Sequence, residues 1–244
     1  MATKLDHNQY TNNVMSVIWS DYNLEQLRQH AVQTFRKGGG SRPDVLLIEI
    51  EGEKAVLKDQ SAADKLFATI IGPLLNWREC KALNKLEKVS CVPNLLHIPN
   101  SRSFLMSYHE SEQVTRLDTL TPEWPDFFEQ LHIAVSQIHS KGVTHNDLRN
   151  PTNILVTPDG EPILVDLVAC FCQGPSWNIP NRWLFNKFRQ VDLSAITKLK
   201  KRVAPALLNN TDIEAKEIAG NIGLAAKFLG QVIRKLSGLF FTKK

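Results

Sequence analysis

Three side chains with oxygen donors lie near the middle of the chain at spacings that suit chemistry on a phosphate group. Asp147 stands in a polar segment, Asn153 follows it by six positions, and Asp166 follows it by nineteen. Carboxylate and amide oxygens are hard ligands, and Mg²⁺ usually takes only one or two protein carboxylates together with phosphate oxygens. The three residues therefore indicate a site that positions a metal-bound phosphate group for transfer.

Two predicted elements must hold these side chains in place. Six apolar residues at helical spacing between 127 and 138 predict a helix, which the Lys141-Gly142 pair ends. After the polar segment, the apolar runs 154–156 and 162–165 flank a Pro-Asp-Gly turn, so they predict a β-hairpin. The amide and the second carboxylate lie at the two open ends of this hairpin, and both can therefore reach one metal ion.

Residues 145–153 read His-Asn-Asp-Leu-Arg-Asn-Pro-Thr-Asn. This segment resembles the catalytic loop of protein-kinase-like phosphotransferases, whose pattern is H-x-D-x-x-x-x-N and whose next segment begins with a metal-binding Asp. The resemblance covers residues 35–200 and implies an α+β, bilobal protein-kinase-like fold. Residues 1–30 would then form an N-terminal extension, residues 31–108 a small β-rich N-lobe, and residues 109–244 a mainly helical C-lobe.

The resemblance also implies a role for each polar residue of the loop. Asp147 would accept a hydrogen bond from the acceptor hydroxyl and take its proton, and Arg149 would face the transferred phosphate. Asn153 and Asp166 would bind Mg²⁺. His145 would be structural, hydrogen-bonded beneath the metal-binding segment.

A run of small residues stands where these enzymes keep a glycine-rich loop, namely Gly38, Gly39, Gly40 and Ser41. Glycines let backbone N–H groups turn toward phosphate oxygens, so the resemblance assigns the run to the ATP phosphates. The spacing departs from the family's G-x-G-x-x-G pattern. A flexible turn between two strands therefore remains an equal alternative.

The next strand, Ala-Val-Leu-Lys, resembles the V-A-I-K strand that carries the nucleotide lysine, so Lys58 would contact the α- and β-phosphates. Glu79 follows Lys58 by twenty-one positions, in a segment whose apolar positions 77, 80, 83 and 86 predict a helix with one buried face. The resemblance pairs Glu79 with Lys58. A solvated surface glutamate is the alternative.

Residues 103–110 predict a strand that runs into a polar segment, at the place of a kinase hinge. Backbone groups near Ser107 and His109 would bind the adenine edge of ATP.

The segment after Asp166 departs from regulated protein kinases. Leu-Val-Ala stands where the family often has Phe-Gly, no Ala-Pro-Glu follows, and a helix expected at Asp192 leaves a short activation segment. Such compactness resembles the small bacterial RIO-like and lipopolysaccharide (Kdo/heptose) kinase-like branch. Asp192 would either steady the catalytic loop, as the equivalent helix Asp does in kinases, or serve as an N-terminal helix carboxylate.

The composition is that of an ordinary soluble globular protein, with 244 residues of which 43% are hydrophobic and 22% charged. The polar N-terminus lacks the apolar core of a signal peptide, and no apolar stretch is long enough to span a bilayer. The four cysteines lack the spacing of a zinc site and are expected to be reduced thiols. These features predict a cytoplasmic protein.

Charge is unevenly distributed along the chain. Residues 181–244 hold thirteen Lys and Arg against four Asp and Glu, whereas residues 1–180 hold sixteen against twenty-one. Residues 218–241 show a basic amphipathic pattern, which predicts either a helix packed on the C-lobe or a helix at the inner face of the membrane. The basic end suggests an anionic partner; nucleic acid is one class of such partner but is not the favoured one.

Together, these residues predict Mg²⁺-dependent transfer of the ATP γ-phosphate to a hydroxyl. A sugar of the lipopolysaccharide core is the favoured acceptor, and a RIO-like serine/threonine protein kinase or ATPase is the second hypothesis. A pseudokinase scaffold ranks third, because Lys58, Asp147 and Asp166 are all present.

Overall fold

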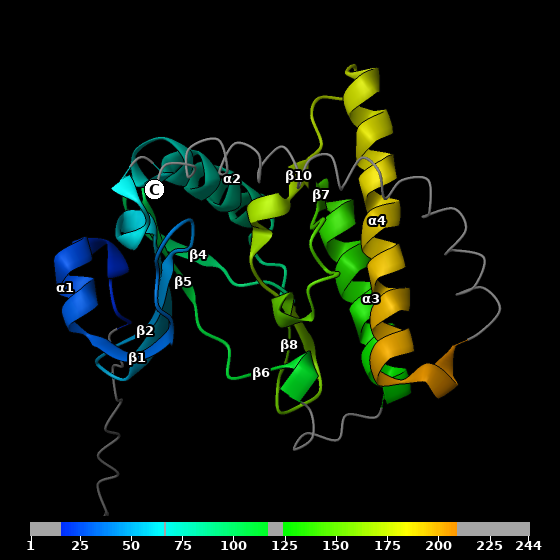
Figure 1. Ribbon diagram of the computed structural model, residues 1–244, viewed down its shortest axis with the longest axis horizontal. Helices are drawn as coiled ribbons and strands as arrows, with labels where there is room; N and C mark the ends of the chain where they lie inside the picture. Colours follow the sequence, from blue (N-terminus) through cyan, green and yellow to red (C-terminus); the bar gives the residue numbers. More distant parts are fainter. Residues whose placement is uncertain (1–15, 66, 117–123, 209–244) are drawn as a thin grey trace, which may run out of the picture.

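The computed structural model describes residues 16–65, 67–116 and 124–208, which form two lobes (Figure 1). The N-lobe is built on a five-stranded antiparallel sheet in the order β1-β2-β3-β5-β4. Its strands are β1 (Ala31–Arg36), β2 (Asp44–Ile50), β3 (Glu53–Asp59), β4 (Leu95–Asn100) and β5 (Ser103–Ser107). Alternating and β-branched apolar residues explain why β2 and β3 pair along their whole length.

The start of the described chain belongs to the N-lobe. A short 3₁₀ turn, η1 (Trp19–Asp21), precedes α1 (Leu24–Gln29), which a capping box at Asn23 begins. Trp19 and Leu27 are buried in one cluster with residues of β2, β3 and β5. The last part of the segment that we expected to be an N-terminal extension therefore packs on the sheet.

The helix α2 (Gly72–Lys85) lies over the N-lobe sheet and reaches toward the C-lobe. A 3₁₀ turn, η2 (Gln60–Ala62), and a π-helical turn, η3 (Phe67–Ile71), lead into it. The predicted buried face is only partly correct, because Cys80, Leu83 and Leu86 are buried whereas Trp77 is 57% exposed. At 3.6 residues per turn, each step of three falls short of a full turn by about 60°, so the ninth position after Trp77 faces about 180° away from it.

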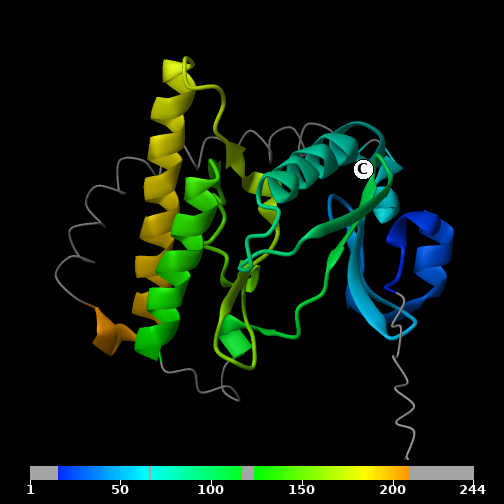
Figure 2. The ribbon, with the colours of Figure 1, turned by 180° about the vertical axis from the view of Figure 1, so that it is seen from behind.

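Two long helices dominate the C-lobe, α3 (Trp124–Ser140) and α4 (Ile179–Val203), which run side by side in both ribbon views (Figures 1 and 2). All six apolar positions predicted for α3 are buried. Gly142 follows α3 with a φ of 72°, as expected of a helix-ending glycine.

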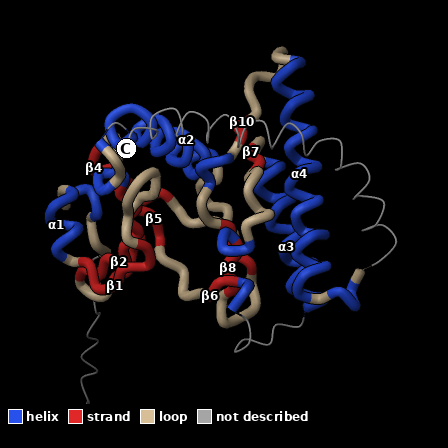
Figure 3. Tube along the Cα trace, viewed as in Figure 1, coloured by secondary structure: helices blue, strands red, loops and turns tan. Residues whose placement is uncertain are grey.

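The remaining C-lobe elements are short; most lie between the N-lobe and the two long helices, and the turn that follows α4 lies at the far end of that helix (Figure 3). The predicted hairpin is confirmed as β8 (Ile154–Val156) and β9 (Pro162–Leu164), with β6 (Glu112–Gln113) beside β8. A second antiparallel pair joins β7 (Val143–Thr144) to β10 (Phe171–Cys172). Single helical turns complete this part, namely η4 (Val114–Arg116), η5 (Pro151–Asn153), η6 (Leu167–Ala169) and η7 (Pro205–Leu207).

One apolar core joins the lobes. Its buried residues include Val56 and Phe104 of the sheet, Leu83 of α2, Leu131 of α3 and Leu164 of β9. The predicted α+β bilobal architecture is therefore confirmed, and the hairpin and the polar loop before it lie where the lobes meet.

The helix expected over residues 218–241 lies outside the described residues. Among the helices that the structure does describe, none combines the length and apolarity that crossing a membrane requires.

Candidate active site

The polar loop between β7 and η5 is held from below by Asp192 of α4. This fully buried carboxylate accepts hydrogen bonds from the backbone N–H of His145 (2.8 Å) and of Asn146 (2.7 Å). It also lies 2.9 Å from Nε2 of His139. Asp192 therefore steadies the loop, and the alternative of a helix N-terminal carboxylate is wrong, because α4 begins at Ile179, thirteen residues earlier.

His145 links the loop to the segment that carries Asp166. Its Nδ1 accepts a hydrogen bond from the N–H of Asp147 (3.3 Å), so the network assigns the ring proton to Nε2, which donates to the carbonyl of Val165 (2.9 Å). The ring is fully buried. These contacts are those of the structural role predicted for His145.

Asn153 stands between the two carboxylates of the predicted site. Its Nδ2 donates to Oδ2 of Asp147 (3.0 Å) and to the carbonyl of the same residue (3.1 Å). The backbone carbonyl of Asn153 accepts a hydrogen bond from the N–H of Val165 (3.0 Å), the residue before Asp166. The three polar side chains that the sequence places up to nineteen positions apart are thus brought together at the open end of the β8–β9 hairpin.

Burial raises the pKa of Asp147, although His145 and the hydrogen bond from Asn153 partly offset the effect. A raised pKa makes a carboxylate a stronger proton acceptor, as a general base requires. Arg149 lies exposed two positions further along the same loop.

Lys58 joins both lobes through two carboxylates. Its Nζ donates to both oxygens of Glu79 on α2 (2.9 and 2.8 Å) and to Oδ1 of Asp166 (2.7 Å). The N–H of Leu167 also donates to Glu79 (3.2 Å). The predicted Lys58–Glu79 pair is present, so the alternative of a solvated glutamate is wrong: both side chains are nearly fully buried.

The charges of this cluster support one another. Burial lowers the pKa of Lys58, but the carboxylates of Asp166 and Glu79 outweigh it, and the pKa ends above its ordinary value. The ammonium of Lys58 lowers the pKa of Asp166 against the effect of burial. Burial raises the pKa of Glu79, which Lys58 only partly offsets. Lys58 therefore stays charged, and Asp166 stays an anion available to a metal ion.

The two predicted metal ligands, Asn153 and Asp166, suit Mg²⁺, which completes its coordination with phosphate oxygens and water. Within the described residues there is no group of three or more His, Cys, Asp and Glu side chains that could hold a metal by themselves.

The glycine run forms the turn between β1 and β2, at the predicted place. Gly38 donates its N–H to the carboxylate of Asp44 (2.6 Å), and Gly39 and Arg42 exchange two backbone hydrogen bonds (3.1 Å each). Two of the N–H groups expected to face phosphate are therefore engaged within the turn. Gly40, with a φ of 59° and open space around it, and Ser41 complete the turn.

The segment predicted to be the hinge follows β5. Ser107 ends β5, but its N–H donates to the carbonyl of Asn94 (2.9 Å), and the carbonyl of His109 accepts from Ser111 (2.9 Å). The N–H of Ser107 is therefore engaged within the N-lobe, whereas the carbonyl of His109 keeps a second lone pair. Tyr108, between them, stacks on Phe35 of β1 with ring centroids 6.4 Å apart and planes 13° apart, so an aromatic pair joins this segment to β1.

Arg36, at the end of β1, is a site residue that the sequence did not single out. Its positive charge contributes to the lowered pKa of Asp166, and its Nε is buried without a hydrogen-bond partner among the described residues. A buried, unpaired cationic donor beside a carboxylate is a place that an anion such as phosphate would satisfy. Only its position just before the glycine run could have indicated this role.

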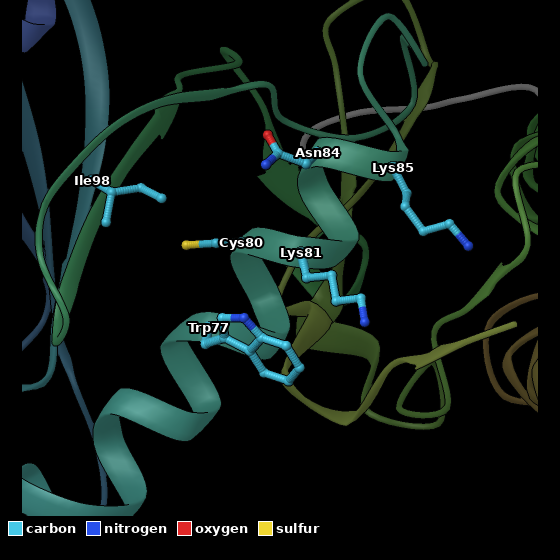
Figure 4. Close-up of a pocket in the computed structure, with 6 residues that line it drawn as sticks. All are labelled: Trp77, Cys80, Lys81, Asn84, Lys85 and Ile98. Carbon is cyan, nitrogen blue, oxygen red and sulfur yellow. The ribbon is translucent and has the colours of Figure 1, made fainter. Parts of the chain in front are cut away.

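A pocket of about 400 Å³ lies on another surface of α2, and none of the predicted site residues lines it (Figure 4). Trp77, Lys81 and Lys85 of α2 and Ile98 of β4 contribute to its wall. The Nζ of Lys81 lies 5.0 Å from the ring centroid of Trp77, which explains how this indole is accommodated at the surface.

The solved structures that share this fold include two of a Rio2 kinase. One is the Rio2 kinase-ADP/Mg²⁺-phosphoaspartate complex from Chaetomium thermophilum, with a TM-score of 0.55 and 18% identity, covering 78% of this chain and 62% of that one. The other is the Rio2 kinase from the same organism, with a TM-score of 0.56 and 16% identity, covering 78% of this chain and 64% of that one. This chain thus corresponds to less than two thirds of those kinases. The likeness shows a protein-kinase-like fold.

No protein-family model matches the sequence, and no curated protein matches it either.

Proposed function

We propose that this protein is an ATP- and Mg²⁺-dependent phosphotransferase that acts on a hydroxyl. The observation that carries the proposal is the buried cluster in which Lys58 contacts Glu79 of α2 and Asp166 of the C-lobe. Burying such a cluster costs free energy unless its charges are paired. The side chain of Asp166 is 30% exposed, so one side of the cluster is accessible to solvent. This arrangement suits a site that receives a metal and a triphosphate.

Each residue of the site has a defined task in such a reaction. Lys58 and Arg36 would hold phosphate oxygens, while Asn153 and Asp166 would hold Mg²⁺. When bound, Mg²⁺ neutralises the charge of the phosphate oxygens. Asp147 orients the acceptor hydroxyl and takes its proton as the new O–P bond forms and the bond to the ADP oxygen breaks.

For the acceptor we propose a sugar of the lipopolysaccharide core. The support is indirect: α4 begins thirteen residues after Asp166, which leaves little room for a platform that docks a peptide, and the end of the chain is basic. On this proposal the protein works in the cytoplasm, at the inner face of the membrane.

A second candidate is an ATPase or protein kinase of the RIO kind. It is favoured by one observation, that a structural neighbour is described as a complex with ADP, Mg²⁺ and a phosphoaspartate. In this chain, Asp147 and Asp166 are the carboxylates of the site that could accept a phosphoryl group. A scaffold without activity is the third candidate.

The test is a transfer assay with γ-phosphate-labelled ATP, Mg²⁺ and a bacterial extract separated into protein and glycolipid fractions. Asp147→Asn is the control, because it keeps the shape of the side chain but cannot take a proton. Label in glycolipid that the control lacks supports the sugar kinase. Label on other proteins, stable to hydroxylamine, supports the protein kinase instead.

Hydroxylamine-labile label on the protein itself supports the aspartyl-phosphate ATPase, because acyl phosphates are cleaved by this nucleophile. If the protein binds ATP but transfers no label, the result supports the scaffold without activity.

A further inference from the structure

The N-terminal end of α4 presents large apolar side chains to solvent. Trp177 is 79% exposed, Ile179 73% and Trp183 61%, values high among the large hydrophobic residues that the structure describes. This end of the helix projects beyond α3 and β10 (Figure 1), and the reverse view agrees (Figure 2). We call these three residues the α4 tip.

The tip is also basic and lacks acidic residues. There is no Asp or Glu between Asp166 and Asp192, whereas Arg182, Lys187 and Arg189 fall in this stretch. The Nζ of Lys187 lies 5.5 Å from the ring centroid of Trp183. The surface therefore combines exposed indoles with cations beside them.

The packing of α4 turns these indoles outward. Asn178 caps the helix by accepting from the N–H of Asn181 (3.0 Å), and Asn181 in turn accepts from the N–H of Gly174 (2.6 Å). Phe185 is buried, and at about 100° per residue it faces away from Trp183, two positions earlier. Ile179 and Trp183 thus lie on the helix itself, and Trp177 lies in the hydrogen-bonded turn that precedes it.

We propose that the α4 tip inserts into the headgroup region of an anionic lipid bilayer. Indole rings favour the boundary between acyl chains and headgroups, and nearby Lys and Arg are attracted to anionic lipid. Exposed indoles with cations beside them, in a stretch without acidic residues, suit an anionic lipid surface, which attracts this charge along its whole extent.

The same helix connects the tip to the active site. Asp192 lies thirteen residues after Ile179, which corresponds to about 20 Å along the helix, and it holds the catalytic loop through His145 and Asn146. Insertion of the tip would therefore hold the loop at about that distance from the point of contact. This inference deepens the proposed function by indicating a lipid-linked acceptor, but the binding itself does not depend on catalysis.

The experiment is sedimentation of the full chain with vesicles of phosphatidylcholine and phosphatidylglycerol, against vesicles of phosphatidylcholine alone. We expect the wild type to bind the anionic vesicles, and the double variant Trp177→Ala/Trp183→Ala to bind at least about tenfold more weakly, a change of about 1.4 kcal/mol. Arg182→Gln/Arg189→Gln should weaken binding to anionic vesicles only. The substituted side chains are exposed, so thermal unfolding should be unchanged.

Trp77→Ala is the matched control, since Trp77 is also exposed and also has a lysine over its ring. It should bind vesicles as the wild type does; an equal loss in both variants would contradict the proposal. Asp147→Asn should also bind normally, which separates a failure of docking from a failure of the proposed chemistry.

A second measurement locates the contact even if another segment also binds lipid. Brominated phosphatidylcholine in the anionic vesicles should quench the tryptophan fluorescence of the wild type and of Trp77→Ala, and quench that of the tip variant far less. Unchanged quenching in the tip variant would overturn the proposal. So would a wild type that binds no vesicle but loses a protein partner when the tip is substituted, because the surface would then serve a protein.

Discussion

The ammonium nitrogen of Lys58 lies 2.7 Å from a carboxylate oxygen of Asp166, although 108 positions separate the two residues. The contact ties strand β3 of the N-lobe to the segment that leaves the β8–β9 hairpin. Asp166 has a second oxygen, so it can keep one on Lys58 while it offers the other to a metal ion. The ion pair therefore places the lysine and the metal ligand in one site before any nucleotide binds.

Replacing Lys58 tests the buried cluster as a source of stability. Lys58→Met leaves Glu79 buried without its counter-ion, and we expect the free energy of unfolding to fall by about 3 kcal/mol, measured by urea unfolding. Lys54→Met is the control, because Lys54 lies on the same strand and pairs with Glu49 at 4.0 Å in solvent. That variant should change stability by less than about 1 kcal/mol. If both variants lowered the free energy of unfolding equally, burial of the cluster would not contribute to stability.

The way in which the free energy of unfolding falls at acidic pH should depend on Asp166. Because Lys58 lowers its pKa in the folded protein, the unfolded chain binds more protons near the ordinary value of 3.8. Asp166 thus contributes stability above that value, and the contribution is lost as the pH falls toward the folded pKa. At about pH 6, Asp166→Asn should have a lower free energy of unfolding than the wild type. Below about pH 4, the difference between the two proteins should become smaller. A gap independent of pH would contradict the assignment.

Support of the catalytic loop by Asp192 can be separated from nucleotide binding. Asp192→Asn keeps one acceptor oxygen but loses the other, so one of the N–H groups of His145 and Asn146 loses its partner. One such lost hydrogen bond to a charged group corresponds to roughly a tenfold fall in kcat. The KM for ATP should stay near that of the wild type, because Lys58 and Arg36 lie on β3 and β1. A rise in KM without a fall in kcat would argue against this role.

Arg36 should contribute to nucleotide affinity. Its Nε is buried and has no partner among the described residues, so Arg36→Met should weaken ATP binding by about tenfold, as expected for a lost charge-assisted hydrogen bond. The neighbouring Lys37 is exposed, and Lys37→Met should bind ATP almost normally. Calorimetric titration with ATP measures the affinity of both variants. A similar loss of affinity in both would show that net charge alone determines binding.

Cys172 should react with alkylating agents at a lower pH than Cys91. The neighbouring thiol of Cys170, together with the charges of Lys85 and Lys81, lowers the pKa of Cys172 against the effect of burial. The midpoint of its alkylation by iodoacetamide should therefore lie below the ordinary thiol value of 9.0. Cys91 provides the contrast within the same chain, since burial raises its pKa to about 11. Mass spectrometry of each peptide gives both rates.

Features governed by neighbours in the chain were predictable from the sequence. The spacing of Asp147, Asn153 and Asp166 around a short hairpin placed the three oxygens at one end of it, because a two-stranded turn brings its open ends together. The stripe of apolar residues in α3 likewise follows from helix periodicity alone. Even the pairing of Lys58 with Glu79 followed, through the resemblance to protein-kinase-like enzymes.

Other features depend on how distant segments pack, and only the tertiary structure decided them. Arg36 acquires its place beside Asp166 because the sheet folds over the C-lobe, and nothing in its own neighbourhood distinguishes it from Lys37. Asp192 likewise holds the N–H groups of His145 and Asn146, which lie on the far side of the β8–β9 hairpin in the chain. In both cases the deciding contact joins residues whose separation along the chain carries no information about their distance in space.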